Sequence, residues 1–253
     1  METGKILQIA LNLGEILLTS GAEVYRVEET IKRVCKSYSI ECDCYCTLTG
    51  IFISSEGKIY DPHSLTVIRR VKERKVDLHK IDLVNKFSRE LEKSPIDYDE
   101  ALERVEKIKN TPYFSRPIMI LSASFNAFVY SWLFGGTPLD GFIAFFISMV
   151  IFSLKEFISG YGFFEFLQLF LAGILAGGMT LFFQATIGGF NIDKVIVGAI
   201  MVFVPGLAIT TGIKDALSGD TLSSFAKIGD AALTACALGA GVGITLVIGN
   251  AFI

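Results

Sequence analysis

The spacing of apolar residues divides the chain into two parts. Between residues 1 and 116, apolar positions recur every three or four residues or alternate, and charges lie between them. Between residues 117 and 253, apolar residues form long runs. A run of about 20 apolar residues is long enough to cross a bilayer as a helix. The pattern therefore predicts an N-terminal domain at 1–116 and a transmembrane helical domain at 117–253.

The N-terminal part is predicted to be an α+β domain. Helical periodicity is found in four segments, 4–19, 22–38, 78–91 and 98–109. Residues 40–53 alternate and are rich in Cys, Tyr, Thr and Ile, which predicts a strand. Shorter strands are expected at 58–60 and 65–71. The predicted fold class is an α-helical polytopic membrane protein with an N-terminal α+β cytoplasmic domain.

The C-terminal part is predicted to contain about five transmembrane helices. These spans lie near 117–135, 139–154, 163–187, 192–212 and 222–250. The pairs Gly173/Gly177 and Gly239/Gly243 each place two glycines on one helix face. Small residues at this spacing let helices approach closely in lipid, so they predict tight contacts within the chain or with further membrane chains.

The distribution of charge gives an orientation in the membrane. Residues 1–116 hold 19 of the 23 Lys and Arg and 19 of the 26 Asp and Glu, whereas the rest of the chain holds 4 basic and 7 acidic residues. With the N-terminal domain inside, alternating spans place Lys155, Lys214 and Lys227 inside and Lys194 outside, as the positive-inside tendency requires. We therefore expect a multi-pass protein of the cytoplasmic (inner) membrane with an external C-terminus. Neither part is strongly basic, which argues against nucleic acid as a partner.

The candidate transport path is the stretch 204–230. Its apolar run breaks at Pro205-Gly206, because proline removes a backbone donor and clashes with the preceding helical turn. Five charged residues lie beyond the break, namely Lys214, Asp215, Asp220, Lys227 and Asp230. Charges beside a broken helix are costly in lipid, so they indicate a functional site. The alternative is a short loop on the membrane surface with its charges in water.

The sequence offers little for catalysis or metal binding. Cys42, Cys44 and Cys46 alternate, so a strand would place them on one face. They lack the usual Cys-x-x-Cys spacing, and a buried face of small residues in a reducing compartment is favoured over a metal site. No glycine-rich phosphate loop or hydrolase motif is found. We expect no cofactor, no metal and no enzyme activity, while a channel, a transporter or a receptor stays open on the residues alone.

The run LGEILLTSGAEVYRVE, residues 13–28, resembles the opening signature of the threonine/serine exporter family. The segments 47–51, 67–71 and 205–233 are similar to later segments of that family. In the N-terminal domain the resemblance carries seven motif residues, Ser20, Gly21, Tyr25, Arg26, Glu28, Thr49 and Gly50. Long members carry about ten spans, so the chain resembles the larger component of the split, two-subunit form. This implies a small membrane partner or a homo-oligomer.

The resemblance implies an exporter of small polar metabolites, of which threonine and serine are favoured, driven by an ion or substrate gradient. In this interpretation Asp215 or Asp220 accepts the substrate ammonium, and the broken helix donates to its carboxylate. A shielded aspartate could instead carry a proton. The alternative is a dicarboxylate (succinate-like) exporter subunit, which would need the cations Lys214 and Lys227.

Overall fold

The computed structural model describes residues 3–55, 65–72 and 75–252, which form two compact units. The first unit contains Met1–Tyr113 and Ile209–Ile228, and the second contains Phe114–Ala208 and Gly229–Ile253. The first boundary lies near the predicted one at residue 116. The segment 209–228, however, packs with the N-terminal part, although its sequence suggested the membrane domain.

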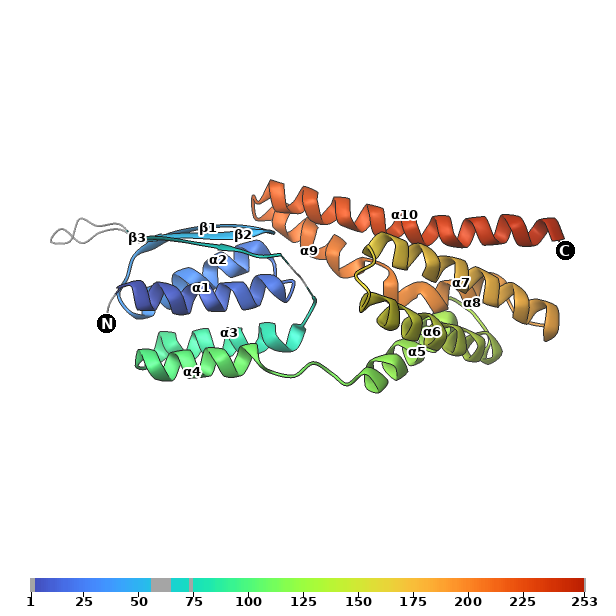
Figure 1. Ribbon diagram of the computed structural model, residues 1–253, viewed down its shortest axis with the longest axis horizontal. Coiled ribbons are helices and arrows are strands. Elements are labelled where there is room, and N and C mark those ends of the chain that lie inside the picture. Colours follow the sequence, from blue (N-terminus) through green and yellow to red (C-terminus); the bar gives the residue numbers. More distant parts are fainter. Residues whose placement is uncertain (1–2, 56–64, 73–74, 253) are drawn as a thin grey trace. The chain divides into compact units, whose positions relative to one another are not determined.

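The first unit is built around one buried helix (Figure 1). Its elements are α1 (Thr3–Thr19), α2 (Val24–Ser37), β1 (Cys42–Thr47), β2 (Gly50–Ser55), β3 (Leu65–Arg70), α3 (Leu78–Lys93) and α4 (Tyr98–Lys109). Helix α1 packs against α2, α3, α4 and the sheet. Its residues Leu7, Leu13 and Leu17 are therefore buried on all sides. A helix that is apolar around most of its circumference is stable in water only when other elements surround it in this way.

The three strands form an antiparallel sheet in the order β1-β2-β3. The single strand predicted at 40–53 is wrong, because the chain reverses at Leu48-Thr49 and forms a hairpin in which Thr47 pairs with Gly50. Thr47 supports the reversal, since its hydroxyl accepts from the Thr49 N–H and donates to the Gly50 carbonyl, each at 3.4 Å. The alternation of residue types continues through this turn, so the sequence pattern did not indicate the reversal. The strand expected at 65–71 is confirmed, and the one at 58–60 lies outside the described residues.

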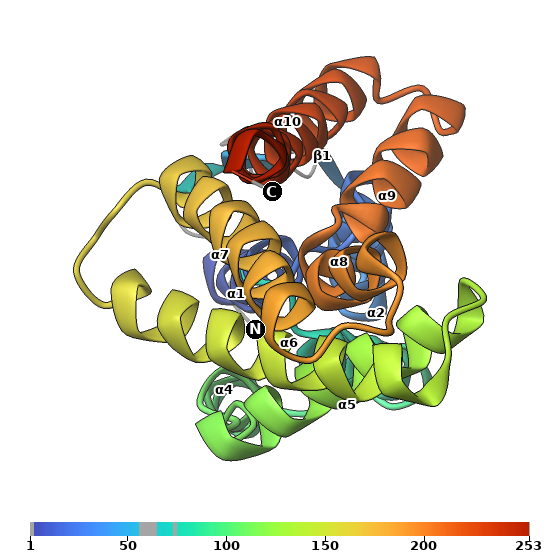
Figure 2. The ribbon, with the colours of Figure 1, turned by 90° about the vertical axis from the view of Figure 1, so that its right-hand side faces the viewer.

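The second unit is a helical bundle. It contains α5 (Arg116–Leu133), α6 (Pro138–Ser159), α7 (Glu165–Thr186), α8 (Ile192–Ile200), the 3₁₀ turn η1 (Met201–Phe203) and parts of α9 (Gly206–Leu217) and α10 (Thr221–Phe252). Helix α8 packs against α5, α6 and α7 (Figure 2). Buried Asp140 caps α6 together with Thr137 and accepts from the Asn191 N–H at 2.8 Å. This carboxylate therefore connects the turn that precedes α6 with the turn that precedes α8.

Among the described residues, three helices are long and apolar enough to cross a membrane, namely α6, α7 and the segment Thr221–Gly249 of α10. A fourth is found if α8 with η1 and α9, which are bent by 55°, count as one span. The break between them falls at Val204-Pro205, one residue before the predicted Pro205-Gly206, and Gly206 begins α9. The first of the five expected spans, α5, does not meet these criteria because polar side chains such as Asn126 interrupt its apolar surface.

Helices α7 and α10 contact each other through glycines. A Cβ atom on Gly173 would overlap the Leu238 carbonyl oxygen, and one on Gly177 would lie 2.9 Å from Cβ of Thr245. Thr245 donates to the Ile174 carbonyl at 3.4 Å. By contrast, a Cβ atom on Gly243 would meet no described atom within 4 Å. The Gly173/Gly177 face is thus used inside the chain, and the face that carries Gly243 is open.

Replacing Gly177 or Gly243 with leucine should distinguish the packed face of α7 from the open face of α10. Gly177→Leu forces α7 away from α10, and overpacking of this kind costs about 1–3 kcal/mol. Gly243→Leu should leave the unfolding temperature of the purified chain unchanged. Thermal unfolding of both variants in the same detergent measures the difference, and equal stability would contradict the observed packing.

Candidate functional site

Three of the five charged residues of the predicted transport path, Lys214, Asp215 and Lys227, contact the segment at the N-terminus of α2 in the first unit. Asp215, on α9, is fully buried, and its Oδ1 accepts from the Val24 backbone N–H at 3.1 Å. Its Oδ2 lies 2.7 Å from Nζ of Lys227, which is 6% exposed. Lys227 also donates to the Ala22 carbonyl at 3.5 Å. Because the first N–H groups of a helix have no helical acceptor and attract negative charge, Asp215 caps α2 from a distant part of the chain.

A second ion pair lies beside the first. Nζ of Lys214 is 3.0 Å from Oε1 of Glu23, which immediately precedes α2, and Arg26 approaches the same carboxylate at 3.5 Å. Burial alone would raise the pKa of Glu23. The backbone N–H of Glu23 and the cations Lys214 and Arg26 outweigh burial and hold that pKa below its usual value. We call Glu23, Lys214, Asp215 and Lys227 the charged cluster.

Local structure explains how α9 and α10 bring the charged cluster together. The two helices cross closely at Gly212, where a Cβ atom would lie 3.3 Å from Cβ of Lys227. The turn between them is fixed by Asp220, whose N–H donates to the Asp215 carbonyl at 2.9 Å. Oδ1 of Asp220 accepts from the Ser223 N–H at 3.3 Å and so caps α10. Asp220 thus positions the cluster and makes no ion pair among the described residues.

The structure separates the predicted path residues into two groups. Lys214, Asp215, Asp220 and Lys227 lie in the first unit, whereas Pro205, Gly206 and Asp230 belong to the second. Asp230 is exposed on α10. Glu23 completes the charged cluster but was not among the candidates, since no spacing in one sequence links it to Lys214.

Three of the family-motif residues shape the turn that carries Glu23. The Ser20 carbonyl accepts from the Asp77 N–H at 3.1 Å. Gly21 has a φ of +84°, which favours glycine, and lies against Val76. Arg26 pairs with Glu23 at 3.5 Å. These residues set the direction in which the chain enters α2.

The other motif residues connect helix and sheet. Oε1 of Glu28 accepts from the Cys46 N–H at 2.8 Å, and the Thr49 carbonyl accepts from the Val71 N–H at 2.9 Å. Gly50 leaves room for the ring of Phe52, which a Cβ atom would approach to 3.4 Å. Tyr25 is half-buried. This part of the motif is structural.

Cys42, Cys44 and Cys46 share one face of β1, as predicted, and the side chain of Cys44 donates to the Glu28 carbonyl at 3.5 Å. Burial raises the pKa of Cys44 to about 12, which keeps its thiol protonated. A hydrogen bond with Cys35 lowers the pKa of Cys42. Within the described parts of the chain, no group of three or more His, Cys, Asp or Glu side chains could hold a metal ion.

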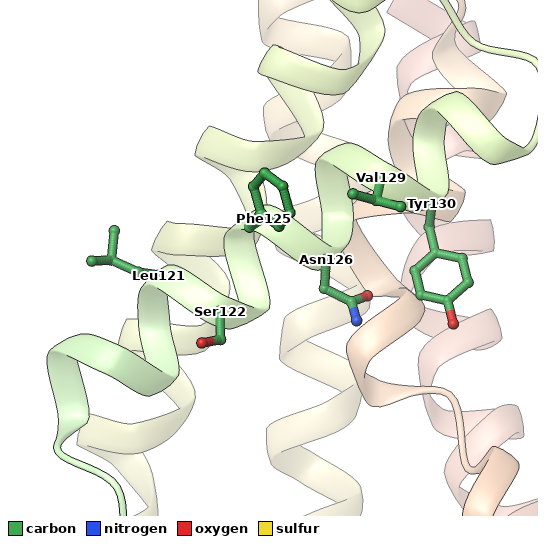
Figure 3. A pocket seen from close by; sticks show the side chains of 6 residues that line it. All are labelled: Leu121, Ser122, Phe125, Asn126, Val129 and Tyr130. Carbon is green, nitrogen blue, oxygen red and sulfur yellow. The ribbon is translucent and has the colours of Figure 1, made fainter.

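A polar stripe on α5 is the feature of the second unit that the sequence analysis missed. It borders a groove of about 460 Å³ whose lining residues are Leu121, Ser122, Phe125, Asn126, Val129 and Tyr130 (Figure 3). The polar members recur at every fourth position, Ser122, Asn126 and Tyr130, and this period was visible in the sequence. Oδ1 of Asn126 is shielded from solvent and has no hydrogen-bond partner in the described residues. Helix α5 also packs against α8 and η1, next to the helix break.

Apolar helices, one of them broken, define a multi-pass membrane protein. The chain belongs to the threonine/serine exporter family, whose model matches residues 8–249. It is similar to the "Probable threonine/serine exporter" of Mycobacterium tuberculosis, with 25% identity over 251 residues, which cover 97% of this chain and 46% of the relative. The chain thus spans about half the length of that relative. No solved structure matches it significantly.

Breaking the buried ion pair should destabilise the first unit. Lys227→Met leaves the carboxylate of Asp215 buried without its cation, which typically costs about 3–5 kcal/mol. Lys214→Met removes a cation whose side chain is 51% exposed, and should cost about 1 kcal/mol or less. Hydrogen exchange of residues 209–228 in the full chain measures both effects. Similar protection in the two variants would contradict the assigned role of Lys227.

Proposed function

We propose that this chain exports threonine, serine and similar small hydroxy amino acids, and that an ion or substrate gradient drives the export. Its membership of the exporter family supports transport, and the polar stripe of α5 carries the assignment of the substrate site. Ser122, Asn126 and Tyr130 supply hydrogen-bonding groups along one face of a bundle helix, between the apolar residues Leu121, Phe125 and Val129. Polar residues in this setting commonly mark a substrate path.

The groove offers what a small hydroxy amino acid requires. A shielded Asn126 Oδ1 is an acceptor for an ammonium group, and the hydroxyls of Ser122 and Tyr130 bind a hydroxyl or carboxylate. The neighbouring apolar ridge of Leu121, Phe125 and Val129 suits a methyl group. The start of α9 after Pro205 adds a helix N-terminus, where negative charge is favourable.

The dicarboxylate alternative has less support. A dicarboxylate needs cations, and the two candidates near the break are already engaged with protein carboxylates. Lys214 lies 3.0 Å from Glu23, and Lys227 lies 2.7 Å from Asp215. Binding a dicarboxylate there would leave at least one of these carboxylates without its cation, which is costly when the group is buried.

The charged cluster is proposed to couple the first unit to transport. Asp215 and Lys227 belong to helices α9 and α10, and both of these helices continue into the second unit. In this proposal, opening of the pair accompanies movement of the broken helix, and a proton on Asp215 would weaken the pair. Asp230, Pro205 and Gly206 contribute to the path from the second unit.

A membrane partner is also proposed. A Cβ atom on Gly239 or Gly243 would meet no described atom within 4 Å, so the small-residue face of α10 is open. A small membrane-protein subunit, or further copies of this chain, would cover such a face through close helix packing. No nucleic acid and no cofactor enter the proposal.

The proposed location is the inner membrane, with the N-terminal unit in the cytoplasm. A cysteine introduced by Lys86→Cys lies on an exposed part of α3. In a Cys236→Ser background it should react with an impermeant maleimide only after the cells are permeabilised. Labelling of intact cells would contradict this orientation.

Removing the central amide should strongly reduce transport of the proposed substrate. Asn126→Leu deletes the shielded acceptor, and losing one hydrogen bond to a charged group costs about 1.5–3 kcal/mol, or roughly ten- to a hundredfold in threonine flux. Ile118→Leu, on an exposed part of α5 outside the groove, is the control and should transport normally. Flux of threonine, serine and succinate into inverted membrane vesicles is the measurement. Wild-type flux in Asn126→Leu would exclude the groove, and transport of succinate alone would overturn the proposed substrate.

A further inference from the structure

The three-stranded sheet has an exposed apolar row on the face away from α1 and α2. Side chains alternate across the sheet, so Cys46, Ile51 and Ile53 are buried on one face. On the other face, Tyr45 pairs with Phe52, and Phe52 pairs with Ile68. Their exposed fractions are 55%, 40% and 63%. Three large apolar side chains thus form a continuous row across all three strands.

Charges stand at two opposite corners of the same face. The register aligns Asp43 with Ser54 and Thr66 on one side of the apolar row, and Thr47 with Gly50 and Arg70 on the other. Asp43 is therefore on edge strand β1, and Arg70 is diagonally opposite on edge strand β3. Strand spacings of about 4.8 Å and rises of about 3.4 Å per residue place their Cα atoms about 17 Å apart, too far for an ion pair within one chain.

This arrangement is self-complementary. Phe52 lies at the centre of the face, and a two-fold axis along the diagonal through Thr47, Phe52 and Thr66 exchanges the corner of Asp43 with that of Arg70. Two faces related in this way stack with their strands crossing at about 70°, which is nearest to the orthogonal class of sheet packing. The other diagonal would place like charges opposite each other, and both axes parallel to the edges would leave the two charges unpaired.

We propose that a second copy of this chain docks on this face, with Phe52 against its counterpart and Asp43 of each copy opposite Arg70 of the other. Six-residue strands give a face of about 20 by 14 Å, which is smaller than the roughly 800 Å² per partner of a standard interface. Such a contact is weak in dilute solution. It becomes effective for chains that a membrane already concentrates, because association then resembles an intramolecular event.

Thiol cross-linking of the full chain in membranes tests the geometry. Thr66 lies on the proposed axis, where stacked sheets hold the two Cα atoms about 10 Å apart, so Thr66→Cys should cross-link to its counterpart through a short bifunctional maleimide. Asp43→Cys lies on the same face but about 17 Å from its own counterpart, and should not cross-link. Both variants carry Cys236→Ser to remove the exposed native cysteine. If the cross-linking yield of Thr66→Cys does not exceed that of Asp43→Cys, the proposal is overturned.

Charge reversal in the Thr66→Cys chain identifies the occupant. Asp43→Arg alone and Arg70→Asp alone each place like charges opposite each other, and should reduce cross-linking about fivefold or more. The two reversals together restore opposite charges between copies and should restore the cross-link. If the double variant fails to cross-link, or if each single variant cross-links as well as the Thr66→Cys chain, the face receives another partner or a lipid surface. Circular dichroism of each variant confirms that the exposed substitutions leave the fold intact.

Discussion

A buried carboxylate that caps a helix from the far end of the chain holds the first unit together. Asp215 accepts from the N–H of Val24 and pairs with Lys227, so one group satisfies a helix terminus and a buried cation at once. Removing either charge would leave the other buried without its counter-ion, and the backbone contacts to Val24 and Ala22 alone offset only part of that desolvation. The turn at Gly21, the crossing at Gly212 and the cap at Asp220 all serve to place these two side chains.

This interaction changes the interpretation of the stretch 204–230. The sequence placed its charges in a transport path because they lie beyond a proline break between apolar segments. The structure retains the break but assigns Asp215 and Lys227 to the compact unit that contains α1 and α2. The second unit instead offers the uncharged stripe of Ser122, Asn126 and Tyr130. Neutral hydrogen-bonding groups can suffice for the zwitterionic substrate that we propose, since its two charges sum to zero.

Local pattern predicted most of the helices, because apolar periodicity and proline act over a few residues. It predicted the buried face of β1 and the break at Pro205 for the same reason. It failed at Leu48-Thr49, where alternation continues through a turn that has no Asn-Gly or Asp-Gly signal. It also could not find Glu23 as the partner of Lys214, since that pair joins residues 191 positions apart. The stripe on α5 has a readable period, but neutral polar side chains are a weaker signal in an apolar run than charged ones.

The length and continuity of helix α10 have a mechanical consequence. It is one uninterrupted helix of 32 residues, about 48 Å long at 1.5 Å per residue, whereas a hydrocarbon core is about 30 Å thick. Its first turns carry Lys227, and its remainder belongs to the bundle. An unbroken helix transmits rotation along its axis as a stiff rod. If a ligand rotates the bundle segment of α10 and the rotation reaches Lys227, that ligand alters the stability of the Asp215–Lys227 pair, and by linkage the pair alters the affinity for that ligand by the same factor.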